Sequence, residues 1–406
     1  MTRLKRLVSK FSPHEKLLLI LYSVVLLGLF LYSYTQIDLS LTFSRITFLR
    51  NLVKSFQYVG YFNRPLSAGI FVILLVLLYG FYIYFLKLAH QKNVRKTFVW
   101  TLVVLATAIL IFSYNAFSYD LFNYMFDAKI VTHYYQSPYQ HKALDYQGDP
   151  MLSFMRWTHR TYPYGPVWLV LTVPLSFLGF QYFIPTFLLF KLLIASSFLG
   201  SLYYIGKIFQ KVKPEKEVFG LTFFGLHPLI LIESLVSAHI DIVMIFFSIF
   251  ALYLLLRKKF LLSFVLLTLS TGIKFATALL LPVFVWLFVL VRRKKTIPWN
   301  LIFGSCVVLM TLAIAVASVR TNFQPWYLIL VLPFAVFLSE SYIILIPSII
   351  VPFFALLNYV PYLYLGNWDK PVPEILNTLN NTSYLLSIFI ILIFPLLKQR
   401  LGKKKA

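Results

Sequence analysis

Long apolar runs follow one another along almost the whole chain, separated by short polar or charged stretches. A helix needs about 20 apolar residues to cross a hydrocarbon layer of about 30 Å. We expect helices over 16–35, 66–88, 97–117, 164–181, 186–206, 218–234, 241–256, 260–273, 275–291, 299–318, 325–338, 341–364 and 377–397. The pattern predicts an all-α fold, a polytopic bundle of about 11–13 spans. Several runs are short, so one or two of them could be re-entrant.

Composition agrees with a single membrane domain over residues 1–406. Of the 406 residues, 60% are hydrophobic and only 12% are charged. This hydrophobic share is larger than a soluble protein needs to build its core. The first run begins near Met1, but no small-residue cleavage site follows it, so we expect a retained helix and not a signal peptide. The lone Cys306 lies within an apolar run, which excludes an internal disulfide and a thiolate metal site.

The formal charge of +24 is concentrated between the apolar runs. Lysine and arginine gather at 3–16, 87–96, 207–216, 257–259, 292–295 and 398–405, which together hold 25 of the 37 cations. Cationic loops of membrane proteins face the cytoplasm and meet anionic lipid headgroups there. We therefore predict a multi-pass protein of the plasma membrane with both termini cytoplasmic, and we expect no nucleic-acid partner.

Following the chain from these cytoplasmic clusters puts four charged residues on the external face. They are Asp120, Asp241, Lys274 and Arg320. Residues 118–163 become a long external loop. The chain must cross the membrane only once between that loop and Lys207, so we expect 164–181, which contains Pro174, not to cross fully.

The segment 36–65 is external in this trace, although it contains Arg45, Arg50, Lys54 and Arg64. Its apolar residues recur with helical spacing at Phe43, Ile46, Phe48, Leu49, Leu52, Val53 and Phe56. Such an amphipathic helix is expected to lie flat on the outer surface.

The external charges are the first candidates for a functional site. An ionisable group at membrane depth costs about 2.5 kcal/mol or more unless it lines a polar cavity. On a helical continuation after Asp120, Tyr124 and Asp127 would share its face. The external loop is rich in tyrosine, including Tyr139 and Tyr164, and such rings suit stacking on sugars as well as an interfacial belt.

Several short motifs occur in a particular order along the chain. They are Asp120-x-x-x-Tyr124, Ser137-Pro138-Tyr139, Tyr162-Pro163-Tyr164-Gly165-Pro166, the stretches 226–233 and 238–241, and Thr271-Gly272-Ile273-Lys274 with Pro282 beyond it. Over about residues 97–330 this order resembles the GT-C fold glycosyltransferases. The similarity is closest to bacterial mannosyltransferases that depend on polyprenol-phosphate-mannose.

The resemblance implies transfer of a hexose, with mannose as the first expectation, from a polyprenyl phosphate to a hydroxyl of a lipid-linked or cell-surface glycan. Asp120 matches the catalytic base of an inverting reaction, and a departing phosphate favours the cations Lys274 and Arg320. The expected substrate-binding residues are Tyr124, Tyr139, Tyr164, His239, Asp241, Trp326 and Tyr327. The implied partners are the bilayer, the lipid-linked sugar donor and a glycan or glycolipid acceptor.

Some residues depart from the pattern or allow more than one interpretation. No Asp-x-Asp pair is present, so we expect no divalent metal and no other cofactor. His227 stands where the resembling pattern has asparagine. His239 and Asp241 could contact acceptor or phosphate, Asp241 could instead cap a helix, and two ligands are too few for a metal site. Lys191 could lie near the donor phosphate or snorkel toward water.

Two other classes of function stay open at this stage. A lipid or glycan transporter or flippase also places charges within the membrane, although no internal repeat is seen in the apolar pattern. A glycan polymerase or ligase would use arginine and histidine of the external loop, where Arg156, His159 and Arg160 are found. The transferase hypothesis further predicts that Asp120, His239, Asp241, Lys274 and Arg320 line one cavity roofed by 118–163, with Asp120 and Lys274 on the order of 10 Å apart.

Overall fold

The computed structural model describes residues 11–41 and 46–403, with side chains as far as residue 395. Among the predicted positions, Phe43, Arg45 and most of the two terminal basic clusters lie outside the described residues. The described chain consists of helices and connecting loops and contains no β-strand, which confirms the all-α polytopic prediction.

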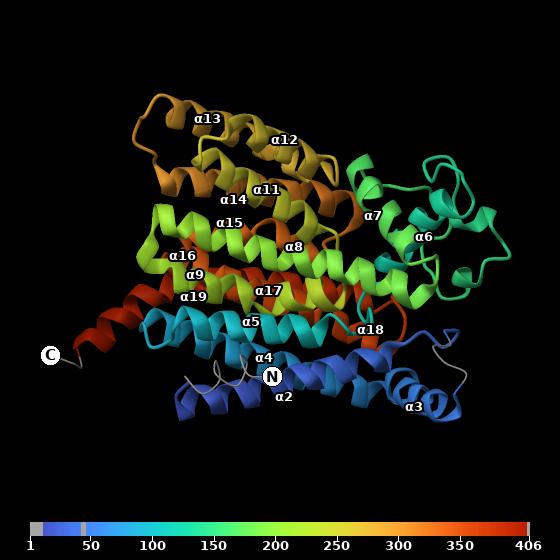
Figure 1. Ribbon diagram of the computed structural model, residues 1–406. Coiled ribbons are helices and arrows are strands. Elements are labelled where there is room, and N and C mark those ends of the chain that lie inside the picture. The colour runs from blue at the N-terminus through green and yellow to red at the C-terminus, as the bar shows by residue number, and fades with distance from the viewer. Residues whose placement is uncertain (1–10, 42–45, 404–406) are drawn as a thin grey trace.

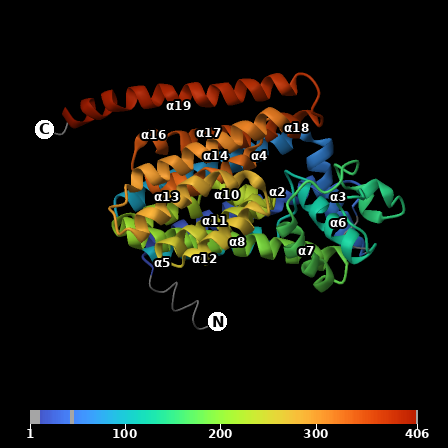
Figure 2. The same cartoon turned by 90° about the horizontal axis from the view of Figure 1, so that it is seen from above.

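Seven helical segments of the described chain are long and apolar enough to cross a membrane, and Figure 1 shows them running side by side. They are α2 with η1 (Pro13–Gln36), α4 (Arg64–His90), α8 (Phe183–Val212), η7 with α13 (Phe275–Arg292), α14 (Trp299–Thr321), α16 to α18 (Tyr342–Leu365) and the first part of α19 (Val372–Lys403). Helix α19 lies along the outside of the bundle in Figure 2 and packs on α17 and α18.

The remaining apolar runs form shorter or bent helices. A bend of 53° separates Pro214–Gly225 from Pro228–Val236, which makes this pair a broken span or a re-entrant segment. The shorter helices are α5 (Lys96–Leu110), α7 (Pro166–Leu178), α11 (Asp241–Leu256), α12 (Phe260–Thr271) and the segment Pro325–Leu338. All thirteen predicted runs therefore correspond to helical segments. The 13 residues of α7 reach only about 20 Å, too short for a full crossing, as expected.

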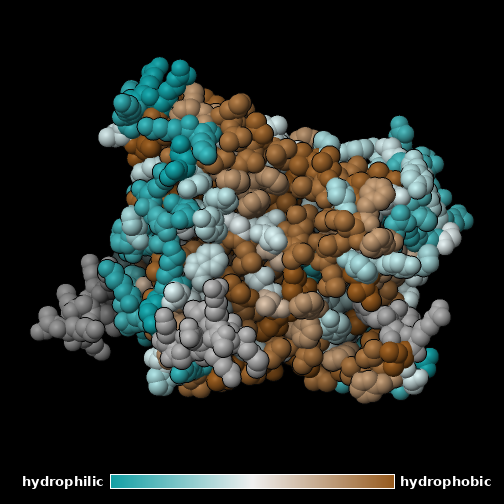
Figure 3. Space-filling view, in the orientation of Figure 1, coloured by the Kyte–Doolittle hydropathy of each residue, from teal (hydrophilic) through white to brown (hydrophobic). Residues whose placement is uncertain are grey.

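The face of the molecule seen in Figure 3 has an apolar band between two polar ends. At one end, ion pairs and a hydrogen bond connect the basic loops. Lys96 Nζ lies 2.5 Å from Glu217, and Lys216 Nζ lies 2.8 Å from Glu340. Lys211 donates to the carbonyl of Leu256. The opposite end is formed by α6 (Asp120–Thr132) and α7 (Figure 1). The clusters that the positive-inside rule places in the cytoplasm thus share one end of the bundle.

Residues 118–163, the predicted external loop, fold on themselves, and α6 packs on α8 of the bundle. The loop contains α6 and the short helices η3 (Ala143–Asp145) and η4 (Pro150–Ser153). Asn123 donates to the carbonyl of Arg156, and the amide of Tyr162 donates to the carbonyl of Pro138. Helix α3 (Thr47–Gln57) lies near this end in Figure 1, with Phe48 73% exposed, as an interfacial helix requires.

Candidate active site

A broken helix positions the first part of the site. After α10 (Pro228–Leu231) and η6 (Ile232–Val236), Ala238 adopts a left-handed φ of 59° and the amide of His239 donates to the carbonyl of Glu233. The buried ammonium of Lys191 donates to the carbonyls of Leu235 and Val236. Lys191 is buried and therefore does not snorkel toward water. It holds the end of η6 from which the His239 loop starts.

His239 connects Asp120 to a second carboxylate. Its Nδ1 lies 3.8 Å from Asp120 Oδ2, and its Nε2 lies 3.3 Å from Glu233 Oε2. The hydroxyl of Tyr359, at the start of α18 (Tyr359–Leu365), donates to Glu233 Oε1 at 2.9 Å. His239 and Glu233 are fully buried, whereas the Asp120 side chain is 15% exposed. Asp120 is thus the member of this chain of contacts that solvent reaches.

Asp241, two residues after His239, holds Lys274. The Lys274 ammonium lies 3.0 Å from Oδ1 and 2.8 Å from Oδ2 of Asp241. Asp241 is buried in the first turn of α11 and makes no capping hydrogen bond, while Lys274 is 24% exposed. The loop 239–241 therefore places a histidine against Asp120 and a carboxylate against Lys274.

Two motifs that are far apart in sequence are hydrogen-bonded to each other beside this loop. The amide of Gly165 donates to the carbonyl of Ile273, and the amide of Val167 donates to that of Gly272, both at 3.0 Å. A Cβ on residue 165 would lie 2.1 Å from the Gly272 carbonyl oxygen, so only glycine allows this approach. The contact fixes Tyr164 next to Lys274, whose ammonium lies 5.8 Å from the centre of the Tyr164 ring.

Aromatic side chains line the rest of the site. The Tyr124 ring packs on Tyr164 at 5.3 Å between centroids, and Trp326 stacks on His239 at 4.1 Å. Tyr327 hydrogen-bonds to Thr321, and Tyr139 donates to the carbonyl of Tyr164. These contacts bring four predicted substrate-binding aromatics (Tyr124, Tyr139, Tyr164 and Trp326) into the set of side chains around His239 and Lys274.

A fourth carboxyl, that of Asp127, lies on α6 near Asp120. Burial raises the pKa of Asp127 to about 8; Arg160 opposes this shift and the negative charge of Asp120 adds to it. Asp127 therefore keeps its proton at neutral pH. Arg160, which the sequence linked only to the polymerase alternative, acts electrostatically on both Asp127 and Tyr164.

Arg320 and His227 were also singled out in the sequence. Arg320 is exposed in the last turn of α14, beside the Thr321 that contacts Tyr327, and no contact joins it to Lys274 among the described residues. His227 is fully buried away from these carboxylates; it accepts from the amide of Leu229 and pairs with the carbonyl of Ser348 at 2.9 Å. His227 thus caps α10.

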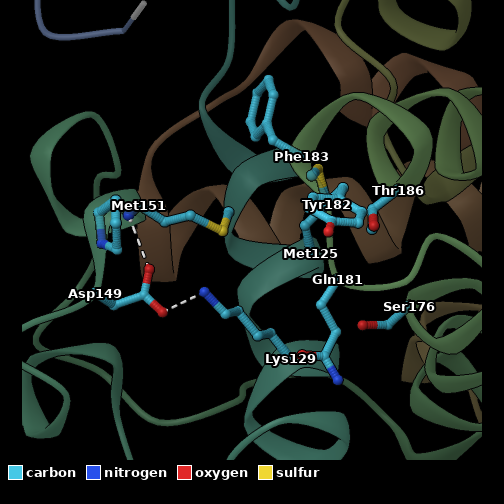
Figure 4. Close-up of a pocket in the computed structure, with 10 residues that line it drawn as sticks. Met125, Lys129, Asp149, Met151, Ser176, Gln181, Tyr182, Phe183 and Thr186 are labelled. Carbon is cyan, nitrogen blue, oxygen red and sulfur yellow. Dashed lines mark hydrogen bonds and ion pairs between the residues drawn. The ribbon is translucent and has the colours of Figure 1, made fainter.

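A cavity of about 200 Å³ lies between α6, α7 and α8. Figure 4 shows Lys129 ion-paired with Asp149 at its edge, together with Met125, Gln181 and Thr186. Met125 and Lys129 lie five and nine residues after Asp120, about 140° and 180° around the helix from it. The cavity is therefore on the face of α6 that points away from Asp120.

The sequence alone did not place Glu233 or Tyr359 in the site, and it indicated Asp127 only as a residue on the same helix face as Asp120. Glu233 was visible as an acid near His239, but Tyr359 follows an apolar run with no distinguishing pattern. Within residues 11–41 and 46–403, no group of three or more histidine, cysteine or acidic side chains is arranged to hold a metal ion.

Comparison with known proteins identifies the class of enzyme. The chain matches the family described as alpha-(1->6)-mannopyranosyltransferase, N-terminal domain, over residues 28–290. Comparisons with curated proteins and with solved structures gave no match. The matched residues include Asp120, His239, Asp241 and Lys274, whereas Trp326, Tyr327 and Tyr359 lie beyond them. The match favours a transferase over a transporter. The chain belongs to the alpha-(1->6)-mannopyranosyltransferase family and is a mannosyltransferase of the GT-C type.

Proposed function

We propose that this mannosyltransferase moves mannose from polyprenyl-phosphate-mannose to a hydroxyl of a lipid-linked or cell-surface glycan at the external face of the plasma membrane. One observation carries the proposal: the loop 239–241 sets His239 against Asp120 and Asp241 against Lys274. We expect a carboxylate base and a cation for the leaving phosphate to flank one position there, as a transfer between them requires.

Asp120 is the base in this proposal because the other nearby carboxyl groups are unsuited to the task. Asp241 is neutralised by Lys274, Glu233 is fully buried, and Asp127 holds a proton at neutral pH. Asp120 takes the proton of the acceptor hydroxyl while the oxygen attacks the anomeric carbon. The bond from that carbon to the phosphate oxygen breaks, and polyprenyl phosphate leaves with its electron pair, which inverts the anomeric centre.

Lys274 is suited to stabilise the departing phosphate. Its ammonium has three N–H donors, and the two contacts with Asp241 leave capacity for a phosphate oxygen. A positive charge beside the leaving group opposes the negative charge that develops there. We place Arg320 as a second cation that approaches the phosphate when the lipid-linked donor is bound.

The family description suggests the linkage. An α-(1→6) product means that the attacking group is the 6-hydroxyl of the acceptor sugar. Because the proposed displacement inverts the anomeric carbon, the donor must be β-linked. The exposed rings of Tyr139 and Trp157 in the external loop suit stacking on acceptor sugars, and the site at the end of the bundle leaves the donor's tail in the bilayer.

The proposal is tested with purified enzyme, radiolabelled polyprenyl-phosphate-mannose and a mannose-terminated acceptor in excess chelator. We expect transfer to persist, and Asp120→Asn to lower it by at least about 100-fold while the protein stays folded. Use of a sugar nucleotide in place of the lipid donor, or a loss that Mn²⁺ or Mg²⁺ restores, would contradict the mechanism. Asp120→Asn activity within a few-fold of wild type would remove Asp120 from the chemistry.

A further inference from the structure

We propose that His239 and Glu233 form a buried positioning pair for Asp120: they orient its carboxylate, and His239 accepts the proton that Asp120 takes from the acceptor. This inference rests on the proposed role of Asp120. Both side chains are fully buried, so in this proposal they act through Asp120 and not through contact with substrate.

The geometry is that of a base oriented by a second group, which is itself held by a third. The two nitrogens of the His239 ring face opposite carboxylates, at 3.8 Å from Asp120 and 3.3 Å from Glu233. Trp326 stacks on the ring with an interplanar angle of 17°, and this fixes the plane in which both nitrogens lie. Tyr359 fixes the other oxygen of Glu233.

The buried atoms of this pair are incompletely satisfied. Both ring nitrogens of His239 and Oε2 of Glu233 have no hydrogen-bond partner within the described part of the chain. Leaving a buried polar group unpaired costs about 1–3 kcal/mol. Catalytic hydrogen bonds are commonly long in the absence of substrate and shorten when it binds. Closure of the 3.8 Å and 3.3 Å gaps on substrate binding would satisfy all of these atoms together.

A metal ion does not explain the same residues. The two nitrogens of one imidazole ring point in opposite directions, so Asp120 and Glu233 cannot share a single ion with His239. A proton transfer does explain them. In the resting state we place the ring proton on Nε2, which faces Glu233, so that the unprotonated Nδ1 faces Asp120. After the acceptor O–H bond has broken, the proton passes from Asp120 Oδ2 to His239 Nδ1, and the imidazolium formed lies between two carboxylates.

Few other titratable groups surround His239. Asp120 faces it from α6, Glu233 from η6 and, through Glu233, Tyr359 from α18. From η8 (Pro325–Leu330), the side chain that packs on the His239 ring is Trp326, which carries no charge. On the histidine's own loop Asp241 is neutralised by Lys274. Removing the charge of Glu233 should therefore alter the charge around the ring more than any other single change apart from Asp120.

His227 provides a matched control. It is equally buried and lies at the other break of the same bent helix, but its nitrogens pair with the backbone of Leu229 and Ser348 and not with carboxylates. Substitution of His227 tests what the loss of a buried structural histidine does, without touching the groups around Asp120.

The decisive variant is Glu233→Gln, which keeps the shape and removes the charge. We expect kcat to fall by about 10–100-fold with the donor KM within about two-fold, and the acid limb of the rate–pH profile to move. His227→Gln should leave the profile where it is. If Glu233→Gln does not fold, Tyr359→Phe removes a single O–H group and should lower kcat by about two- to five-fold with the same movement of the profile.

The outcomes separate this inference from the proposed function. Loss of activity in Asp120→Asn, together with wild-type kcat and pH profile in folded Glu233→Gln or Tyr359→Phe, would overturn the positioning pair alone. Retained activity in Asp120→Asn would overturn the base and the pair that depends on it. A profile that moves equally in His227→Gln would mean that the effect is structural.

Discussion

The two ends of the bundle each contain a lysine–carboxylate pair with the same N–O distance of 2.8 Å, but the surroundings differ. In the Lys216–Glu340 pair at the basic end, the carboxylate side chain is 42% exposed. In the Lys274–Asp241 pair at the α6 end, the carboxylate is 1% exposed. A surface pair contributes about 0–1 kcal/mol, whereas breaking a buried pair costs about 3–5 kcal/mol. The burial of the carboxylate, and not the N–O distance, therefore distinguishes the pair in the candidate site from the pair at the basic end.

Cavity size does not make this distinction. A cavity of about 330 Å³ at the basic end, lined by Lys96, Lys207 and Glu217, is larger than the one of about 200 Å³ beside α6. Neither of them contains Asp120 or Lys274. The side chains that matter for the proposed chemistry are found instead through their burial and their incomplete hydrogen bonding.

The largest effect should follow from breaking the buried pair. Lys274→Met leaves Asp241 charged and without its partner, so we expect about 3–5 kcal/mol of destabilisation and a rate loss of about 100-fold or more. The double variant Lys274→Met with Asp241→Asn removes both charges and should recover most of the stability but not the rate. Thermal unfolding and initial rates against donor concentration measure the two effects separately.

This double variant separates a structural role of Lys274 from a chemical one. If it regains transfer together with stability, Lys274 is a structural lysine and the phosphate role is lost. If it folds and stays inactive, the ammonium is needed by the reaction itself.

The apolar pattern was sufficient to predict the fold, because hydrocarbon length constrains a membrane helix strongly. The expectation that 164–181 does not cross fully came instead from the positions of the basic loops, and the 13-residue helix α7 agrees with it. The external placement of Asp120, Asp241 and Lys274 came from loop charge. Contacts through the stretch 239–241 join them beside α6, which lies at the end opposite the basic loops in Figure 1. Which side of the membrane that end faces stays a prediction, as does the separation between Asp120 and Lys274.

The partners of these residues could not be predicted in the same way. Tyr359 lies 126 residues from Glu233, and nothing in its apolar surroundings marks it. Lys191 looked free in the sequence because its acceptors are backbone carbonyls, which no sequence pattern identifies. The sequence thus indicates where charges interrupt apolar runs, whereas their pairing depends on how separate helices pack.

The next effect concerns pH at the α6 end. The folded protein keeps the Asp127 proton up to about pH 8, while the unfolded chain releases it near pH 4, so the free energy of unfolding falls as pH rises through this window. Asp127→Asn should lose less thermal stability between pH 6 and pH 9 than wild type does. Each kcal/mol relieved corresponds to about 2–4 °C in Tm. Asp145→Asn, on the exposed part of the loop, should behave as wild type; an unchanged pH dependence in Asp127→Asn would contradict the raised pKa.

The smallest effect, of opposite sign in pH, is expected at the basic end. A hydrogen bond from Lys216 lowers the pKa of Glu340; burial opposes the shift and Lys213 adds to it. The pair therefore stabilises the fold above the ordinary glutamate pKa of about 4.5, and this contribution is lost as pH falls below it. Glu340→Gln should cost at most about 1 kcal/mol at pH 7, and that cost should shrink in high salt because exposed charges are screened. Mannosyl transfer should stay at the wild-type rate, since no step of the proposed reaction takes place at this end. A rate loss comparable to that of Lys274→Met, with stability unchanged, would show that the basic end is coupled to the chemistry and that burial alone does not locate the site.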